Sequence, residues 1–297
     1  MKALVYKQTP VVELQDSLSD MAGIRLLMKC EYLNHRFISG NKWWKLKYNL
    51  EEASRLGCKK LLTFGGAYSN HIYATAAAAH ELEFESIGII RGEENLPLNP
   101  TLAFARAKGM DLHYISREEY RRKTEPDFLK GLKELFGDFY LIPEGGTNTL
   151  AVRGVAEFAN LLLHEAAFDY LCLPVGTGGT IAGMISGLDR GKKIVGFPVL
   201  KGASFLEDEI RVYTENENGQ LMYEYHFGGY AKSNERLKAF IKEFERSNNI
   251  PLDPIYTAKM MFGVFDLIKQ GFFKRGSVVL VLHTGGLQGN HPTETNL

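Results

Sequence analysis

The glycine-rich segment Pro174-Val175-Gly176-Thr177-Gly178-Gly179-Thr180 has the composition of an anion-binding loop. Glycines let several backbone N–H groups turn inward without Cβ clashes, and such donors at a helix N-terminus bind phosphate. Ile181 replaces the third glycine of a dinucleotide fingerprint, and no Gly-Lys-Ser/Thr follows. A single phosphate is therefore favoured over a dinucleotide or a triphosphate. The alternative interpretation is a tight turn without a ligand.

A second glycine loop, Gly65-Gly66-Ala67-Tyr68-Ser69-Asn70-His71, also follows an expected strand and opens an expected helix. The first N–H groups of a helix have no intrahelical partner, and they favour an anion such as a carboxylate. Ser69 and Asn70 are also preferred N-cap residues. Taken by itself, the segment is therefore better explained by helix capping than by carboxylate binding.

The third candidate is Lys42, which follows Gly40 and Asn41 at the start of an expected helix. Desolvation and the positive end of a helix both lower the pKa of a lysine amine. A neutral amine can form a Schiff base with a carbonyl compound. The alternative is a solvated surface lysine, which is the commoner situation for a lone lysine.

Two further segments, Pro143-Glu144-Gly145-Gly146-Thr147-Asn148 and His283-Thr284-Gly285-Gly286, again place glycines after strands. His283 could exchange protons, although a structural role is commoner for a histidine at a strand end. The eight histidines lack metal-ligand spacing such as His-x-x-x-His, so no metal is predicted. The chain has no Gly-x-Ser-x-Gly motif, which argues against an α/β-hydrolase.

These loops must be positioned by strands and helices that alternate along the chain. Alternation of this kind predicts an α/β fold with parallel sheets covered by helices on both faces. At about 150 residues per domain, the length suggests two closely joined lobes. We expect strands over 24–29, 60–64, 86–90, 111–115, 139–142, 170–175, 193–197 and 277–282, and helices over 43–56, 70–82, 101–108, 152–166, 180–188, 234–246 and 258–270.

Composition limits the possible classes of protein. With 297 residues, 35 basic against 35 acidic side chains and 45% hydrophobic residues, the chain is not a disordered one. No excess of positive charge is available to neutralise a phosphate backbone, so a nucleic-acid-binding protein is disfavoured. We expect no signal peptide and no membrane span. Three scattered cysteines suggest a reducing compartment, and hence a cytoplasmic protein.

The four motifs occur in a familiar order: Asn41-Lys42 at a helix start, Ser69-Asn70-His71, the glycine loop 176–180, and 283–286. From about Leu33 to Gly286 the sequence resembles pyridoxal-phosphate enzymes of the tryptophan-synthase-β fold type. Within these it is most similar to the 1-aminocyclopropane-1-carboxylate deaminase and D-cysteine desulfhydrase family. The resemblance implies two open, twisted parallel-sheet lobes with a cofactor cleft between them, as in fold-type II enzymes. It also implies a larger domain of residues 1–46 plus 147–297, a smaller inserted domain of residues 47–146, and a homodimer.

The resemblance further implies a role for each matching residue. Lys42 would hold pyridoxal 5′-phosphate as a Schiff base and take the substrate's α-proton. Ser69 could also act as a nucleophile or proton shuttle. Tyr256 would face the cofactor ring and, with Lys42 and Ser69, would be a catalytic residue. Asn70 would contact the ring's 3′ oxygen, and Thr257 the ring nitrogen. The substrate carboxylate would be bound by Ser69, Asn70 and His71. The cofactor phosphate would be held by Gly176, Thr177, Gly178, Gly179 and Thr180.

Thr257 bears on the reaction type. Deaminases of the family have a glutamate at this position, and the desulfhydrases have a neutral residue as here. A neutral partner makes the ring a weaker electron acceptor, which favours expulsion of a thiolate over opening of a cyclopropane. We therefore expect β-elimination from a small amino acid such as D-cysteine. The alternatives are 1-aminocyclopropane-1-carboxylate deamination, a non-catalytic relative that binds the cofactor or an amino acid, and a nucleotide-binding α/β protein.

Overall fold

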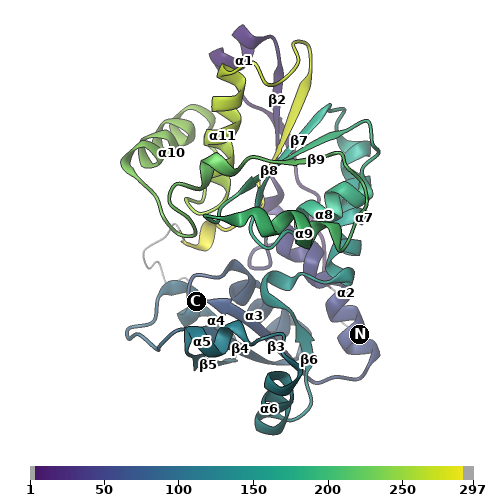
Figure 1. Ribbon diagram of the computed structural model, residues 1–297, viewed down its shortest axis with the longest axis vertical. Helices are drawn as coiled ribbons and strands as arrows, with labels where there is room; N and C mark the ends of the chain where they lie inside the picture. Colours follow the sequence, from purple (N-terminus) through teal and green to yellow (C-terminus); the bar gives the residue numbers. More distant parts are fainter. Residues whose placement is uncertain (1–3, 290–297) are drawn as a thin grey trace.

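The computed structural model describes residues 4–289, which form two sheets, one above the other in Figure 1. The larger sheet has the strand order β1-β2-β10-β7-β8-β9, and the smaller has the order β5-β4-β3-β6. The strands of the larger sheet are β1 (Val11–Glu13), β2 (Arg25–Lys29), β7 (Tyr170–Val175), β8 (Lys193–Pro198), β9 (Gly219–Leu221) and β10 (Val278–Leu282). Those of the smaller sheet are β3 (Lys60–Gly66), β4 (Glu85–Arg91), β5 (Met110–Ile115) and β6 (Tyr140–Ile142).

All strand pairs are parallel except one. The edge strand β1 runs antiparallel to β2, so the larger sheet is mixed rather than wholly parallel. Both sheets otherwise have the parallel pairing that alternating strands and helices predict. The carboxyl ends of the parallel strands in each sheet therefore lie along one edge, where ligands bind in open α/β sheets.

Helices cover both faces of the larger sheet. Neighbouring strand residues point to opposite faces, so Leu27 packs into one core and Met28 into the other. The first core is built with α2 (Asn41–Arg55), α7 (Thr149–Glu165) and α8 (Gly179–Gly187), and the second with α10 (Glu235–Asn248) and α11 (Thr257–Lys269). α1 (Ser17–Ala22) contacts α11, and α9 (Leu206–Arg211) contacts α8.

The smaller sheet is covered in the same way. Ile89 belongs to the core beneath α5 (Arg117–Arg121) and α6 (Pro126–Phe136), whereas its neighbour Ile90 packs with α3 (Asn70–Leu82) and α4 (Pro100–Ala107). All four of its strands come from residues between 60 and 142. The α/β fold with two sheet lobes and helices on both faces is confirmed.

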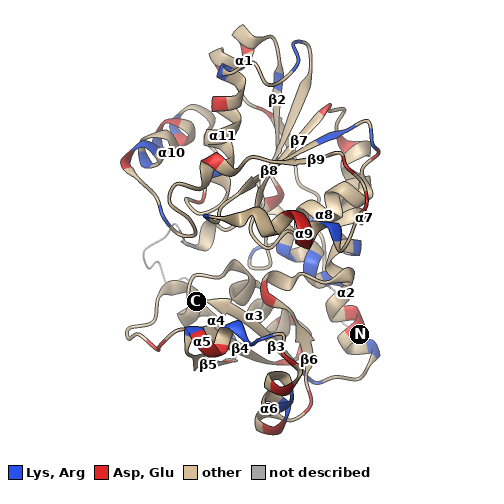
Figure 2. Ribbon diagram, in the orientation of Figure 1, with Lys and Arg blue, Asp and Glu red and all other residues tan. Residues whose placement is uncertain are grey.

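Helix α2 lies between the two sheets in Figure 1. Its first half carries three lysines and its second half two glutamates, whereas charges of both signs are scattered over the outer surfaces (Figure 2). Among the described residues, no helix has both the length and the apolar character that a bilayer crossing requires.

Most expected elements are present within three residues of the expected ends. The elements that the sequence pattern did not reveal are short or amphipathic: β1, α1, α5, α6, α9 and β9. All of these except α6 have three to six residues, too few to show a period. The 11-residue α6 is long enough to show an amphipathic period and could have been predicted from the sequence. All of these elements add edges and covers to the two sheets and leave the order of the central strands unchanged.

Candidate active site

Lys42 lies in the first turn of α2, the helix that Figure 1 shows at the junction of the two lobes. Its side chain is half-buried, and its amine donates a 2.9 Å hydrogen bond to Oδ1 of Asn41. Burial lowers the pKa of Lys42 to about 8, although the negative charge of Asp253 opposes this shift. The neutral, nucleophilic amine is therefore accessible near physiological pH.

Gly40 makes the turn that presents Lys42. Its φ of 68° and ψ of −144° lie in a region that side chains with a Cβ avoid. A Cβ on Gly40 would also overlap the backbone carbonyl of Thr284, after β10. Glycine at this position thus lets the start of α2 approach the carboxyl end of the larger sheet.

We expect Gly40→Ala to destabilise the protein by about 3 kcal/mol, because strain and a backbone clash act together. Thermal unfolding of the apoprotein would measure the loss. Gly57→Ala is the matched control, since Gly57 also has a positive φ of 69° but nothing lies within 4 Å of its added Cβ. Equal effects of the two substitutions would contradict the role given to the Gly40–Thr284 contact.

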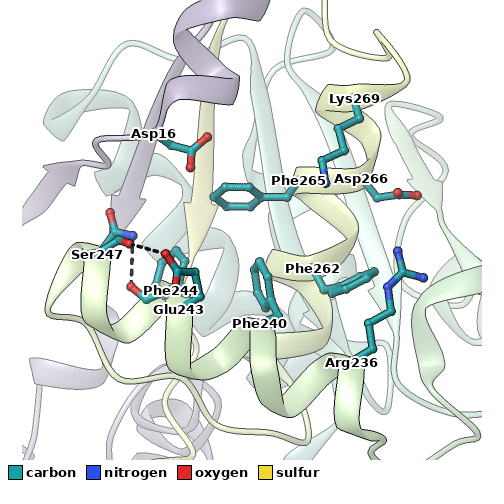
Figure 3. Close-up of a pocket in the computed structure, with 11 residues that line it drawn as sticks. Asp16, Arg236, Phe240, Glu243, Phe244, Ser247, Phe262, Phe265, Asp266 and Lys269 are labelled. Atoms are coloured by element: carbon teal, nitrogen blue, oxygen red, sulfur yellow. Dashed lines mark hydrogen bonds between the residues drawn. The ribbon is translucent and has the colours of Figure 1, made fainter.

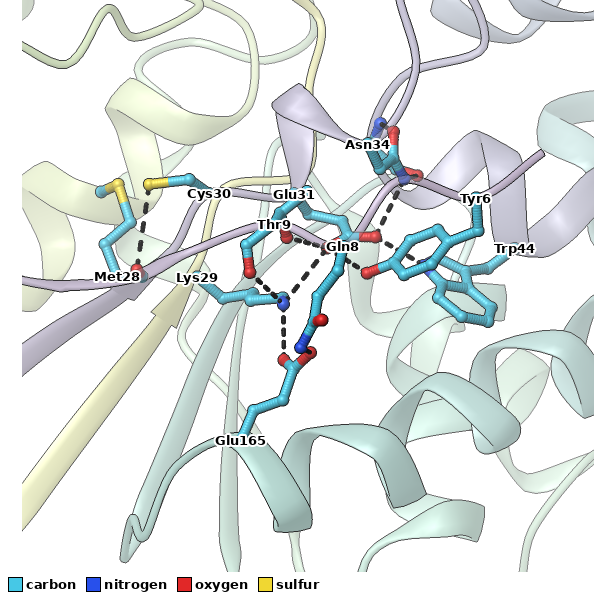
Figure 4. A network of polar contacts seen from close by, with 11 residues as sticks. Tyr6, Gln8, Thr9, Met28, Lys29, Cys30, Glu31, Asn34, Trp44 and Glu165 are labelled. Atoms are coloured by element: carbon cyan, nitrogen blue, oxygen red, sulfur yellow. Dashed lines mark hydrogen bonds and ion pairs between the residues drawn. The ribbon is translucent and has the colours of Figure 1, made fainter.

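A buried polar network holds the segment before this turn (Figure 4). The fully buried Glu31 carboxylate accepts hydrogen bonds from Trp44 Nε1 (2.7 Å) and Asn34 Nδ2 (2.9 Å), and from a threonine hydroxyl at 2.8 Å. Asn34 in turn accepts from the Gly40 N–H at 2.9 Å and donates to the Gly40 carbonyl at 3.0 Å. This network ties both ends of the turn to the start of α2.

The glycine loop 176–180 connects β7 to α8, as expected. Asn41 Nδ2 donates to the Thr180 hydroxyl at 2.8 Å, so the Lys42 amine is joined to this loop through a single asparagine. Gly178 has a φ of 78°, which places the following N–H groups at the start of α8. The loop and the lysine therefore lie close together in the structure.

Lys45 is a buried lysine that the motifs did not identify. It is 1% exposed, and its amine donates to the Thr147 hydroxyl at 2.8 Å. A Cβ added to Gly179 would lie 3.1 Å from that amine. Burial, and then the charge of Lys42, lower the pKa of Lys45 well below its usual value. Lys45 follows Lys42 by three residues, so both lie on one face of the helix. This spacing is the sequence signal by which Lys45 could have been predicted as a site residue.

The second glycine loop opens α3. The Ser69 hydroxyl accepts a 3.3 Å hydrogen bond from the Ile72 N–H, so Ser69 is the N-cap that the simpler interpretation favoured. Its own hydroxyl proton stays available for a ligand. Asn70 accepts a hydrogen bond from the Gln288 side chain, and its Nδ2 lies 2.6 Å from where a Cβ on Gly286 would be. Asn70 therefore faces the carboxyl end of β10.

The ring of His71 is committed to the protein. Thr63 donates its hydroxyl proton to the Ile142 carbonyl at 2.8 Å, so it accepts at 2.8 Å from Nε2–H of His71. Nδ1 then carries only a lone pair, and it has no partner among residues 4–289. Burial and the charges of Lys42 and Lys45 keep the ring neutral by lowering its pKa. Only the backbone N–H of His71 is left for a carboxylate.

Tyr256 lies beside the anion loop, since a Cβ on Gly176 would lie 3.3 Å from its ring. Tyr230, which no motif identified, lies next to it with ring centroids 6.1 Å apart. The Tyr230 hydroxyl donates to the Tyr68 carbonyl at 3.4 Å, which joins the two lobes across the site. Burial raises the pKa of Tyr256 well above its usual value, so its phenol keeps its proton.

Thr257 is fully buried and is not an isolated hydroxyl. It donates to Oδ2 of Asp253 at 2.7 Å and accepts from the Asp253 N–H at 2.9 Å. Asp253 also accepts from the N–H groups of Tyr256 and Thr257, both at 2.8 Å. The neutral hydroxyl of Thr257 is therefore hydrogen-bonded to a buried carboxylate.

His283 has a structural environment. It is fully buried, its Nε2 lies 2.8 Å from the Pro251 carbonyl, and its ring packs against Tyr32. Burial lowers the pKa of His283, although the Pro251 carbonyl opposes this shift. The structural role that the sequence favoured for this residue agrees with these contacts.

A groove with aromatic walls lies elsewhere on the surface. It encloses about 360 Å³ between α10 and α11, and its walls include Phe240, Phe262 and Phe265 (Figure 3). The charged side chains at its edge include Arg236 and Asp266. None of its lining residues belongs to the cluster around Lys42, so it is a separate feature of the surface.

The clustered residues fit a phosphorylated aldehyde. Lys42 has an amine of lowered pKa, and the loop 176–180 and Lys45 have N–H groups, hydroxyls and an amine that could hold a phosphate. Tyr256 supplies an aromatic wall. A two-lobed α/β fold with this donor set defines a class of enzyme that binds a carbonyl cofactor by its phosphate and by a lysine.

The comparisons with known proteins agree. Residues 2–285 match the family described as "Pyridoxal-phosphate dependent enzyme", and the chain belongs to this family. A bifunctional D-cysteine desulfhydrase/1-aminocyclopropane-1-carboxylate deaminase of Arabidopsis thaliana is 30% identical over 90% of this chain and 73% of its own. A D-cysteine desulfhydrase of Klebsiella pneumoniae is 30% identical over 95% of this chain and 93% of its own.

The solved structure of a homologue of 1-aminocyclopropane-1-carboxylate (ACC) deaminase superposes on this chain with a TM-score of 0.84. It is 28% identical in sequence and covers 97% of this chain and 92% of its own. The protein is therefore a pyridoxal-phosphate-dependent enzyme, as the motif order predicted.

Proposed function

We propose that this protein removes a β-substituent from a small amino acid in the manner of a D-cysteine desulfhydrase, giving pyruvate, ammonia and hydrogen sulfide. The observation that carries the proposal is the Lys42 amine, whose pKa is about 8 and which is joined through Asn41 to Thr180 of the anion loop. Relatives of similar length are named for this activity.

Pyridoxal phosphate, when bound, supplies an electron-accepting ring for the charge left at the α-carbon. Loop 176–180 and Lys45 would hold its phosphate, and Lys42 its aldehyde carbon. Asn70 would contact its 3′ oxygen, Tyr256 its ring, and Thr257, backed by Asp253, its nitrogen. Each assignment uses a donor, an acceptor or a ring face that the hydrogen bonds described above leave available for the cofactor.

In the proposed reaction the backbone N–H groups of Asn70 and His71 and the Ser69 hydroxyl bind the substrate carboxylate. The Lys42 amine takes the α-proton. The C–S bond then breaks, and the departing sulfur takes up protons as hydrogen sulfide. The phenols of Tyr256 and Tyr230 keep their protons at neutral pH because burial raises the pKa of each, so they can donate one. Water finally replaces the amino group.

Deamination of 1-aminocyclopropane-1-carboxylate is the second candidate. It is favoured by the Asp253 carboxylate, which accepts the Thr257 hydroxyl proton at 2.7 Å and would support a proton on the ring nitrogen. Some relatives are also named for that activity. Thr257 itself supplies no charge, which favours elimination of a thiolate.

We expect turnover of D-cysteine to exceed that of 1-aminocyclopropane-1-carboxylate by about tenfold or more in kcat/KM. Ammonia release from both compounds, and from a panel of D- and L-amino acids, would measure the preference. Faster turnover of the cyclopropane would contradict the inference that the neutral Thr257 favours elimination of a thiolate. Loss of all turnover with cofactor bound would instead indicate a non-catalytic relative.

The proposal extends to organisation. We propose domains of residues 1–46 plus 147–297 and of residues 47–146, and a homodimer located in the cytoplasm. The four strands of the smaller sheet fall between residues 60 and 142, which supports the inserted domain. All three cysteines are free, which supports a reducing compartment. Analytical ultracentrifugation would test the dimer.

A further inference from the structure

Lys259 is a buried cation with no assigned task. It lies in the first turn of α11, is fully buried, and donates to the backbone carbonyls of His226 (2.9 Å) and Gly229 (2.8 Å). Burial lowers the pKa of Lys259 to about 8, against the opposing charge of Asp253. Burying a lysine amine costs free energy, so its two hydrogen bonds to backbone carbonyls suggest that it has a role in this part of the fold.

The carbonyls belong to a strained segment, residues 226–232, here named the tyrosine loop. Positive φ angles occur at Phe227 (53°), Gly228 (94°), Gly229 (117°) and Ala231 (55°). Phe227 and Ala231 carry a Cβ and adopt this conformation at a cost. Such a conformation persists only where surrounding contacts hold it, and the Lys259 amine supplies two of them.

The tyrosine loop delivers one side chain to the active site. Between Gly229 and Ala231, Tyr230 reaches across to the Tyr68 carbonyl of the other lobe and lies beside Tyr256. Tyr68 directly precedes Ser69 at the start of α3. The position of Tyr230 therefore depends on the conformation of this loop, which is hydrogen-bonded to Lys259 of α11.

We propose that Lys259 is a positioning residue, which holds the tyrosine loop so that Tyr230 closes the substrate side of the active site. This inference rests on the proposed function, because it assigns Tyr230 to the wall that meets the substrate's β-substituent. Lys259 itself touches neither substrate nor cofactor. Its effect should therefore appear in substrate binding and in the order of the loop.

Two variants disturb the loop in different ways. Lys259→Met removes the amine, and Gly229→Ala places a Cβ at a φ of 117°, where the nearest atoms of Lys201 lie 3.5 Å away. The second variant leaves the core of α11 intact. The matched controls are Lys269→Met, an exposed lysine of the same helix, and Gly271→Ala, which has a φ of 70° and no neighbour within 4 Å.

Kinetics on D-cysteine give the first measurement. We expect Lys259→Met and Gly229→Ala each to raise KM about tenfold with a smaller change in kcat, and the controls to leave both near wild type. Tyr230→Ala should raise KM similarly and should also lower kcat, because it removes a phenol that can donate a proton to the departing sulfur. Adding Lys259→Met to Tyr230→Ala should add little, since coupled residues are not additive. A full additive loss would overturn the proposal.

Trypsin cleavage after the exposed Lys232 gives a measurement that needs no turnover. In the apoprotein, mapped by mass spectrometry, we expect about tenfold faster cleavage at this site in Lys259→Met and Gly229→Ala than in the controls. If Lys259→Met does not fold, Gly229→Ala decides. The proposal would be overturned if a folded Lys259→Met or Gly229→Ala variant had the KM and the trypsin cleavage rate of the wild type. An inactive wild type would defeat the proposed function, and cleavage alone would then decide this inference.

Discussion

Lys42→Ala should abolish covalent attachment of the cofactor and lower turnover by about 10³-fold or more. The amine is both the predicted attachment point and the predicted base, and the next lysine on that helix face, Lys45, is hydrogen-bonded to Thr147. Borohydride reduction followed by mass spectrometry would detect attachment in the wild type and none in the variant. Lys59→Ala, an exposed lysine after the same helix, is the control.

The pH dependence of the attachment gives a second readout. Because burial lowers the pKa of Lys42 to about 8, the rate of reaction of the apoprotein with pyridoxal phosphate should rise with pH and level off above about pH 8. An unperturbed lysine would continue to gain reactivity up to about pH 10.4. Attachment at another lysine, or a profile of the unperturbed kind, would refute the assignment of Lys42.

Lys45→Met should weaken cofactor binding by about 30-fold, because a hydrogen bond to a charged group contributes about 2 kcal/mol. The amine lies against Gly179 and Thr147, where the phosphate would be held. Titration of the apoprotein with pyridoxal phosphate, followed by absorbance, would measure the affinity. Lys47→Met, two residues along α2 and paired with Glu157 at 2.7 Å, is the control.

The same substitution should leave the apoprotein as stable as the wild type or more stable. Burial lowers the pKa of Lys45, so at pH 7 the unfolded chain binds this proton more tightly than the fold does. That difference destabilises the folded apoprotein below the unfolded pKa of about 10.4, and a methionine removes it. Weaker cofactor binding with unchanged or higher apoprotein stability separates a ligand role from a packing role. A large fall in stability would contradict it.

The sequence by itself determined the fold class and the cofactor. Alternating strands and helices predicted two sheets covered on both faces, because hydrophobic period and glycine breaks are local properties. The order of the four motifs identified the family, and Lys42 with the loop 176–180 was found from residue types alone. Most elements that were left out, such as β1 and α9, contain too few residues to show a period. The 11-residue helix α6 is the exception, because its amphipathic pattern is long enough to be found.

The tertiary structure decided which groups near those motifs are free to act. Lys45 and Tyr230 lie at the site because they contact groups that are far away in the chain, Thr147 and the Tyr68 carbonyl. Asp253 lies only four residues before Thr257, and the fold buries the two side chains together. The ring of His71 is withdrawn from carboxylate binding by its hydrogen bond to Thr63. Hydrogen-bond partners and burial depend on how segments pack, and a linear pattern of residue types does not carry that information.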